Sequence, residues 1–295
     1  MGRRKRLSGD IKKINELMKV EHNVLMTKLS REEYLKNRHP SYTDLMDMFA
    51  GDSILTSDAY KYGLNATEPA DIKTGWDLND SSGAQLWLNA VQKFKPLVVI
   101  IGHPCTLNCS FNKNINFKDD EVDRQRLLRE LQTMKKAAVD TIWLQIEGGR
   151  YFMLENPPTS DLWNNDDIQE ISDHPDVESR IGHSGAYGAV CKDGPIVKAF
   201  RWMSNSLALL DAVGKKLTKE ERAECVKIEG KHTKDSQVYP DKLCYSILTG
   251  IQTLAKARNG NRFAWAMETM YPKAVACGEA DKASTFNNSW ERRHE

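Results

Sequence analysis

The sequence has no long hydrophobic run, few cysteines and almost no net charge. Its longest apolar run, residues 96–102, is far shorter than the roughly 18 residues that a membrane-spanning helix needs. The basic residues near the N-terminus are not followed by an apolar segment, so we expect no secretory signal. Six cysteines in 295 residues then indicate reduced thiols in the nucleus or cytoplasm. Membrane proteins and secreted disulfide scaffolds are therefore poor interpretations.

What remains is the composition of an ordinary globular protein, with an uneven charge distribution. The chain is 40% hydrophobic and 28% charged, close to the average for soluble domains. A net charge of +1 does not by itself indicate a nucleic-acid-binding protein. The basic stretch at residues 2–6 could contact phosphates or direct nuclear import, and a solvated tail explains it equally well.

Strands and helices are expected to alternate through the middle of the chain. Apolar runs predict strands, and 3.6-residue periodicity predicts helices. The predicted strands lie at residues 42–49, 64–68, 96–102 and 151–154, and the predicted helices at 53–62, 84–94 and 123–145. This alternation predicts an α/β fold with a mostly parallel, doubly wound sheet.

The rest of the chain is expected to add a hairpin and helical extensions. Residues 186–191 and 196–203, around the turn Lys-Asp-Gly at 192–194, predict a β-hairpin at the sheet edge. Helices are predicted at 8–38, 207–213 and 242–258. We therefore expect a basic helical N-terminal extension (1–40), one α/β domain (41–205) and a helical C-terminal extension with a polar tail (206–295).

The first segment that could carry chemistry follows the first predicted strand. In residues 47–53 small residues lead from the strand into a helix, which lets a ligand approach the backbone closely. Glu68 and Asp77 follow further along, and such carboxylates can accept hydrogen bonds from ribose hydroxyls or an adenine amine. One glycine is not a Gly-x-Gly-x-x-Gly fingerprint, so an ordinary strand–helix turn remains open.

The second segment follows the strand predicted at residues 96–102. Cys105 comes directly after Pro104, which places its thiol at the rim of the sheet. A thiolate there is a candidate nucleophile if nearby dipoles or cations lower its pKa. A small buried thiol, or a zinc site that includes Cys109, are the alternatives. No paired Cys-x-x-Cys spacing supports zinc, so we expect no metal.

The third segment ends the strand predicted at residues 151–154. Glu155 and Asn156 place a carboxylate and an amide at the same rim, where ligands of open α/β sheets bind. A glutamate in this position can hold the edge of a base and donate or accept a proton. A strand-end acid that only caps the next helix is the alternative.

Together, the three segments resemble those of Rossmann-like S-adenosylmethionine-dependent methyltransferases, nearest to the DNA cytosine-C5 methyltransferases. Residues 47–51 (Asp-Met-Phe-Ala-Gly) are similar to the family's first motif, residues 102–105 (Gly-His-Pro-Cys) to its Pro-Cys nucleophile loop, and residues 155–156 to its Glu-Asn motif. The resemblance covers roughly residues 41–205. Residues 149–158 also resemble methyltransferase-like domains carried by retroelements and large viruses.

This resemblance implies methyl transfer to nucleic acid, DNA in the first place, with S-adenosyl-L-methionine as cofactor. It implies that the Cys105 thiolate attacks C6 of a cytosine rotated out of its stack, that Glu155 engages N3 and the exocyclic amine, and that Asn156 belongs to the same catalytic group. The cofactor-binding residues that it implies are Phe49, Ala50, Gly51, Asp52, Glu68, Asp77 and Pro104.

Departures from the family pattern keep two alternatives open. His103 stands where proline is usual and Thr106 where glutamine is usual, and no clear Gln-x-Arg-x-Arg segment is present. Residues 156–159 (Asn-Pro-Pro-Thr) are similar to the loop of N6-adenine and N4-cytosine amino-methyltransferases, with threonine in place of the aromatic residue. The altered motifs would also suit a methyltransferase-like binding module that has lost catalysis.

Overall fold

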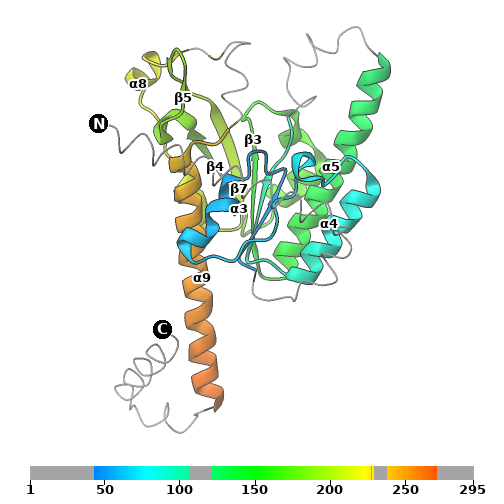
Figure 1. Cartoon of the computed structure of the whole chain (residues 1–295), viewed down its shortest axis with the longest axis vertical. Coiled ribbons are helices and arrows are strands. Elements are labelled where there is room, and N and C mark those ends of the chain that lie inside the picture. Colours follow the sequence, from blue (N-terminus) through cyan, green and yellow to red (C-terminus); the bar gives the residue numbers. More distant parts are fainter. Residues whose placement is uncertain (1–42, 106–120, 227, 229–237, 271–295) are drawn as a thin grey trace, which may run out of the picture. The chain divides into compact units, whose positions relative to one another are not determined.

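The computed structural model describes residues 43–105, 121–226, 228 and 238–270 (Figure 1). The helix predicted at 8–38, the polar tail beyond residue 270 and the position of Cys109 lie outside the described residues. The chain divides into two compact units, residues 1–251 and 252–295. Every residue of the site belongs to the first unit.

The first unit is built on a mixed five-stranded sheet, so the α/β class is confirmed. The strand order is β1-β2-β3-β7-β4. The first three strands run parallel, and β7 runs antiparallel to both of its neighbours. The strands are β1 (Leu45–Met48), β2 (Val98–Gly102), β3 (Tyr151–Asn156), β4 (Glu178–His183) and β7 (Ala199–Ser204).

The order in which the chain visits the sheet reverses at β1. After β1, residues 65–70 run along its outer edge, where Thr67 N–H donates to the Leu45 carbonyl at 3.0 Å and Ala70 N–H to the Asp47 carbonyl at 2.8 Å. The strand predicted at 64–68 is thus reduced to two parallel bridges. The chain then crosses to β2 on the other side of β1. A reversal of this kind is a topological switch point, and ligands bind in the crevice beyond its strand ends.

Helices cover both faces of the sheet. Alternate strand residues such as Met46, Ile101 and Leu154 point into one hydrophobic core with α4 and α5. The residues between them point to the opposite face, where α3 contacts β1 and α7 contacts β4 and β7. The helices are α3 (Ile54–Asp58), α4 (Ser81–Phe94), α5 (Glu121–Glu147), α6 (Asp166–Ser172), α7 (Leu207–Val213), α8 (Lys219–Ala223) and α9 (Asp241–Met270).

The packing of α4 shows how the sequence sets one of these elements. Asp80 caps its N-terminus by accepting a hydrogen bond from Ser82 N–H at 2.9 Å, as N-cap aspartates do. Lys95 ends it in the left-handed conformation. The buried Trp87 donates from Nε1 to Thr141 Oγ1 on α5 at 2.9 Å, which satisfies both polar atoms inside the core.

The predicted hairpin is wrong in its pairing. β7 pairs with β3 and β4, whereas the residues before it form the short helix η5 (Ser184–Tyr187) and a separate two-stranded sheet, β5 (Val190–Cys191) and β6 (Gly194–Pro195). β4 shows no alternating apolar pattern and was not predicted. The position of β4 depends on close packing against α7, because a Cβ on Gly182 would overlap the Val213 carbonyl at the end of α7.

Within the described ranges, no helix combines the length and apolar character needed to cross a membrane.

Candidate functional site

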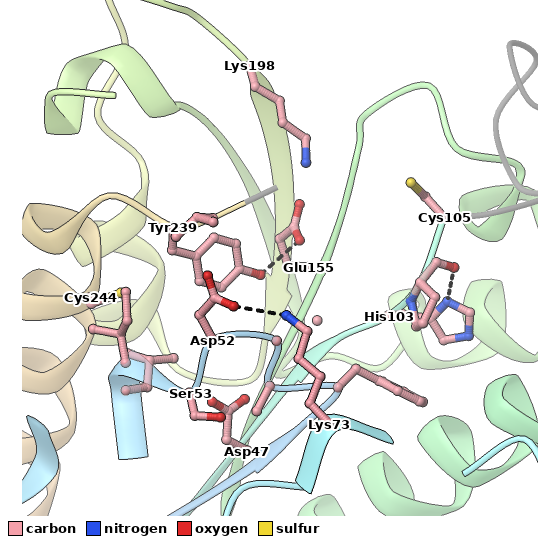
Figure 2. Close-up of a pocket in the computed structure, with 18 of the residues that line it drawn as sticks. Asp47, Asp52, Ser53, Lys73, His103, Cys105, Glu155, Lys198, Tyr239 and Cys244 are labelled. Atoms are coloured by element: carbon pink, nitrogen blue, oxygen red, sulfur yellow. Dashed lines mark hydrogen bonds and ion pairs between the residues drawn. The ribbon is translucent and has the colours of Figure 1, made fainter. Parts of the chain in front are cut away.

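A cavity of about 410 Å³ opens at the carboxyl ends of β1, β2 and β3, beside the switch point (Figure 2). Its wall is formed by the turn after β1, the loop after β2, the end of β3, the residue before β7 and the start of α9. The residues that line the cavity include Asp47, Phe49, Ala50, Gly51, Asp52, Lys73, Gly102, His103, Pro104, Cys105, Glu155, Lys198, Tyr239 and Cys244.

The turn after β1 has an unusual backbone. Phe49, Gly51 and Ser53 have φ values of 61°, 56° and 60°, and positive φ is uncommon for residues other than glycine. Such conformations cost free energy and persist only where surrounding structure enforces them. Here Gly51 N–H donates to Asp71 Oδ2 at 3.0 Å. A Cβ on Gly51 would meet no atom within 4 Å, so the space beside this turn is open.

Asp71 and an ion pair brace the rim of the cavity. The Asp71 carboxylate also accepts from Lys73 N–H at 2.9 Å, so it joins the turn after β1 to the helix η2 (Ile72–Thr74). Lys73 Nζ lies 2.9 Å from Asp52 Oδ1, with both side chains about half exposed. An exposed pair of this kind contributes little to stability, and its charges are available to a ligand.

Asp47 is a buried carboxyl group that lines the cavity. It is only 4% exposed. Burial, and then the charge of Asp71, raise its pKa to about 8. Among residues 43–105, 121–226 and 238–270, no side chain forms an ion pair or hydrogen bond with its carboxyl. Burying a carboxylate that has no partner costs free energy. Asp47 is therefore stabilised either by protonation or by a cationic group of a ligand.

Glu155 has one of its oxygens satisfied and the other unsatisfied. Tyr239 Oη donates to Oε2 at 2.8 Å. Oε1 is buried and has no hydrogen-bond partner in the described part of the chain. Burial raises the pKa of Glu155, and the Lys198 charge and the Tyr239 hydrogen bond lower it in part. An unsatisfied buried oxygen on a cavity wall is a place for a ligand donor or acceptor.

The loop after β2 brings Cys105 to the same cavity. His103 precedes it, with an exposure of 3%, and burial lowers the pKa of its imidazole to about 4. The ring is therefore neutral at pH 7, and its Nδ1–H donates to the Pro104 carbonyl at 2.9 Å. Nε2 is then an acceptor and has no partner among the described residues. Figure 2 shows the Cys105 thiol across the open space from Glu155.

Seven of the predicted site residues share this cavity and three do not. Asn156 is fully buried, and its Nδ2 donates to the His103 carbonyl at 2.5 Å, so it ties the end of β3 to the loop after β2. Asp77 is exposed and accepts from Asn79 N–H at 3.0 Å. Glu68 lies in the segment beside β1. The residues that converge are Phe49, Ala50, Gly51, Asp52, Pro104, Cys105 and Glu155.

Sequence reasoning missed Asp71 and Tyr239 as site residues. Tyr239 lies 84 residues after its partner Glu155. In the sequence, the pair Tyr-Pro at this position indicates only a turn before a helix. Asp71 carries a signal that could have been used, because it follows Gly51 by 20 residues, the spacing of the acid in dinucleotide-binding units. The described residues include no cluster of three or more metal-ligating side chains.

No protein-family model matches this chain, and comparison with curated proteins likewise gives no significant match. Only the cavity itself therefore points to a function.

Proposed function

We propose that the protein is an S-adenosylmethionine-dependent methyltransferase of Rossmann-like fold that acts on nucleic acid, with C5 of cytosine in DNA as its target. The observation that carries this proposal is that Cys105 and Glu155, from neighbouring strands, line one cavity together with the turn after β1. That cavity lies at a topological switch point, the expected ligand position in open α/β sheets.

The cavity suits the cofactor in three respects. Its volume of about 410 Å³ is in the range of small-molecule sites. Open space lies beside Gly51, where a ligand can approach the backbone. The buried Asp47 carboxyl has no cation among the described residues, and S-adenosylmethionine carries an ammonium and a sulfonium. Asp52 at the rim can accept hydrogen bonds from hydroxyl groups. Glu68 and Asp77 do not line the cavity, and we assign them no contact with the cofactor.

In this reaction Cys105 is the nucleophile and Glu155 is the proton donor to the target base. The target cytosine leaves its stack, at a cost of a few kcal/mol. As the Cys105 sulfur forms a bond to C6, the Glu155 carboxyl donates its proton to N3, and the electron pair of the C5–C6 double bond becomes available at C5. S-adenosylmethionine, when bound, would supply an electrophilic methyl group to C5, and its sulfur would leave as a neutral thioether. A base removes the C5 proton, the C5–C6 double bond reforms, and N3 returns its proton as the thiolate leaves.

The site favours this route over the amino-methyltransferase alternative. That reaction needs the amide of residues 156–159 to hold the amine of the base. Asn156 is fully buried, donates to the His103 carbonyl and does not line the cavity. The thiol and the carboxyl, which the C5 reaction needs, do line it.

Two cations near the cavity support a nucleic-acid substrate. Lys198 lines the cavity, and neither it nor Arg201 has an ion-pair partner in the described ranges. Arg201 lies on β7 beside Asn156, with its guanidinium 4.4 Å from the centre of the Trp163 ring. Cations that are not neutralised by an ion pair are available to the phosphates of a polynucleotide.

Calorimetric titration with S-adenosylmethionine tests the cofactor part of this proposal. We expect saturable binding and the release of up to one proton at pH 7, because Asp47, with a pKa of about 8, is mostly protonated until a ligand cation lowers its pKa. At pH 9 Asp47 is already ionised, so this release should disappear. Titrations in buffers of different ionisation enthalpy count the proton.

The Asp47→Asn variant should bind more weakly and release no proton. Asp211→Asn, a change at an exposed residue of α7, is the matched control. Absence of any saturable heat with wild-type protein would leave only a methyltransferase-like scaffold. Equal proton release from Asp47→Asn would remove Asp47 from the site.

A further inference from the structure

We propose that Tyr239 is a positioning residue: by donating a hydrogen bond to Glu155 Oε2, it keeps the carboxyl proton on Oε1, the oxygen that addresses the substrate. This inference rests on the proposed function, since it assigns Glu155 the role of proton donor to a base. The sequence motifs that suggested the reaction end well before Tyr239, and its segment enters the site only through the fold.

Tyr239 is held firmly in place. Its ring packs on Trp202, with the ring centres 5.7 Å apart. A Cβ on Gly102 would lie 3.3 Å from the Tyr239 hydroxyl, so the last residue of β2 leaves just enough room for this hydroxyl. The following Pro240 carbonyl accepts hydrogen bonds from Leu243 and Cys244 N–H, which anchors the segment to the start of α9. These contacts leave the hydroxyl directed at Glu155.

The direction of the hydrogen bond follows from the surroundings of Tyr239. Burial and the nearby charges of Glu155 and Asp47 raise its pKa well above the usual value, so Tyr239 keeps its proton. The hydroxyl therefore still has a proton to donate, and Glu155 Oε2 accepts the hydrogen bond at 2.8 Å. The carboxyl proton of Glu155 is therefore placed on Oε1, which points away from Tyr239 toward the space below Lys198 (Figure 2).

Several other titratable groups line the same cavity as Glu155. Lys198, before β7, lowers the pKa of Glu155 through its charge. The remaining titratable groups on the cavity wall are Asp47 from β1, the Asp52–Lys73 pair at the rim, His103 and Cys105 after β2, and Cys244 from α9. None of them, in the described residues, forms a hydrogen bond with the Glu155 carboxyl. Tyr239 alone distinguishes one oxygen from the other.

This distinction matters for a cytosine edge. N3 of cytosine is an acceptor, and its exocyclic amine is a donor. A carboxyl with its proton on Oε1 donates to N3, while Oε2 accepts from the amine through its remaining lone pair. Without the Tyr239 hydroxyl, the proton can lie on either oxygen, and the edge that Glu155 presents is no longer fixed.

The Tyr239→Phe variant tests this inference, because it removes the hydroxyl and keeps the ring that packs on Trp202. Tyr187→Phe is the matched control: Tyr187 is a buried tyrosine whose hydroxyl donates to the Ala212 carbonyl, outside the cavity. We expect Tyr239→Phe to lower kcat for methyl transfer roughly 10- to 100-fold. This loss is smaller than the whole contribution of a general acid, because Glu155 keeps its proton but no longer holds it on one oxygen. KM for S-adenosylmethionine should not change.

The second readout is the titration of Glu155 itself, followed by the carboxyl ¹³C resonance that disappears in Glu155→Gln. A hydrogen bond to the ionised form lowers a pKa, so its loss should raise the pKa of Glu155 in Tyr239→Phe. The alkaline limb of the pH–rate profile should move to higher pH with it. Neither should move in Tyr187→Phe.

The two readouts separate the inference from the proposed function. If the Glu155 resonance titrates in Tyr239→Phe as it does in wild type, or if kcat falls no further than in Tyr187→Phe, the inference is wrong. If wild-type protein transfers no methyl group to any nucleic acid, the proposed function is wrong and Tyr239 positions nothing for it. In that case a shifted titration would show that the Tyr239–Glu155 contact nevertheless exists in solution.

Discussion

Replacing Cys105 by serine is expected to reduce methyl transfer by at least about 10³-fold while leaving cofactor binding intact. A serine hydroxyl is hardly ionised at neutral pH and is a much weaker nucleophile than a thiolate, so the attack on C6 should fail. The turn after β1, beside which we propose that the cofactor binds, is built without Cys105. Single-turnover transfer from labelled S-adenosylmethionine measures the first effect, and calorimetry the second.

Cys191→Ser is the matched control for this variant. Cys191 is half-buried like Cys105, but it lies on β5, outside the cavity wall, and its replacement should leave transfer unchanged. A Cys105→Ser protein that methylates nucleic acid at the wild-type rate would refute the assignment of the nucleophile. The remaining candidates would then be reactions without a covalent enzyme intermediate.

Glu155→Gln should produce the second large effect, a loss of roughly 10²- to 10⁴-fold in transfer, the usual size of a general-acid contribution. The amide keeps the shape of the side chain and an oxygen that accepts from Tyr239, but it has no proton to give to N3. Burial raises the pKa of Glu155, so wild-type protein should stay active above the pH at which an ordinary glutamate has lost its proton. The pH–rate profile measures this limb.

Glu178→Gln provides the control for the charge change, because Glu178 is about half exposed on β4, outside the cavity, and pairs with Arg180. We expect it to behave as wild type. If Glu155→Gln retains the activity of Glu178→Gln, proton donation by Glu155 is not part of the mechanism.

The sequence was sufficient to predict those elements whose signals are local. β2 is an uninterrupted run of β-branched residues, and the helix that ends at Gly63 has a C-terminal glycine with positive φ. β4 and the pairing of β7 could not be predicted in this way. Position 182 requires glycine because α7 packs closely against it. The residues of β7 pair with residues 16 to 51 positions away in the sequence, which no local pattern encodes.

The same distinction applies to the site. Strand-end residues such as Gly51, Cys105 and Glu155 could be predicted to converge, because the carboxyl ends of parallel strands meet at one edge of the sheet. Tyr239 arrives from a segment that is not part of the sheet, so its contact depends on tertiary packing. Asn156 has the right position in the sequence, but its orientation toward the His103 carbonyl depends on a loop in another part of the chain.

Product analysis tests the central claim most directly. The protein is incubated with labelled S-adenosylmethionine and a mixture of double-stranded DNA, single-stranded DNA and RNA, and each polymer is then digested to nucleosides. We predict label in 5-methylcytosine from DNA with wild-type protein, and none with Cys105→Ser. Label in N6-methyladenine or N4-methylcytosine, or no labelled nucleoside from any polymer, would contradict the proposal that Cys105 and Glu155 form a cytosine-C5 methylation site.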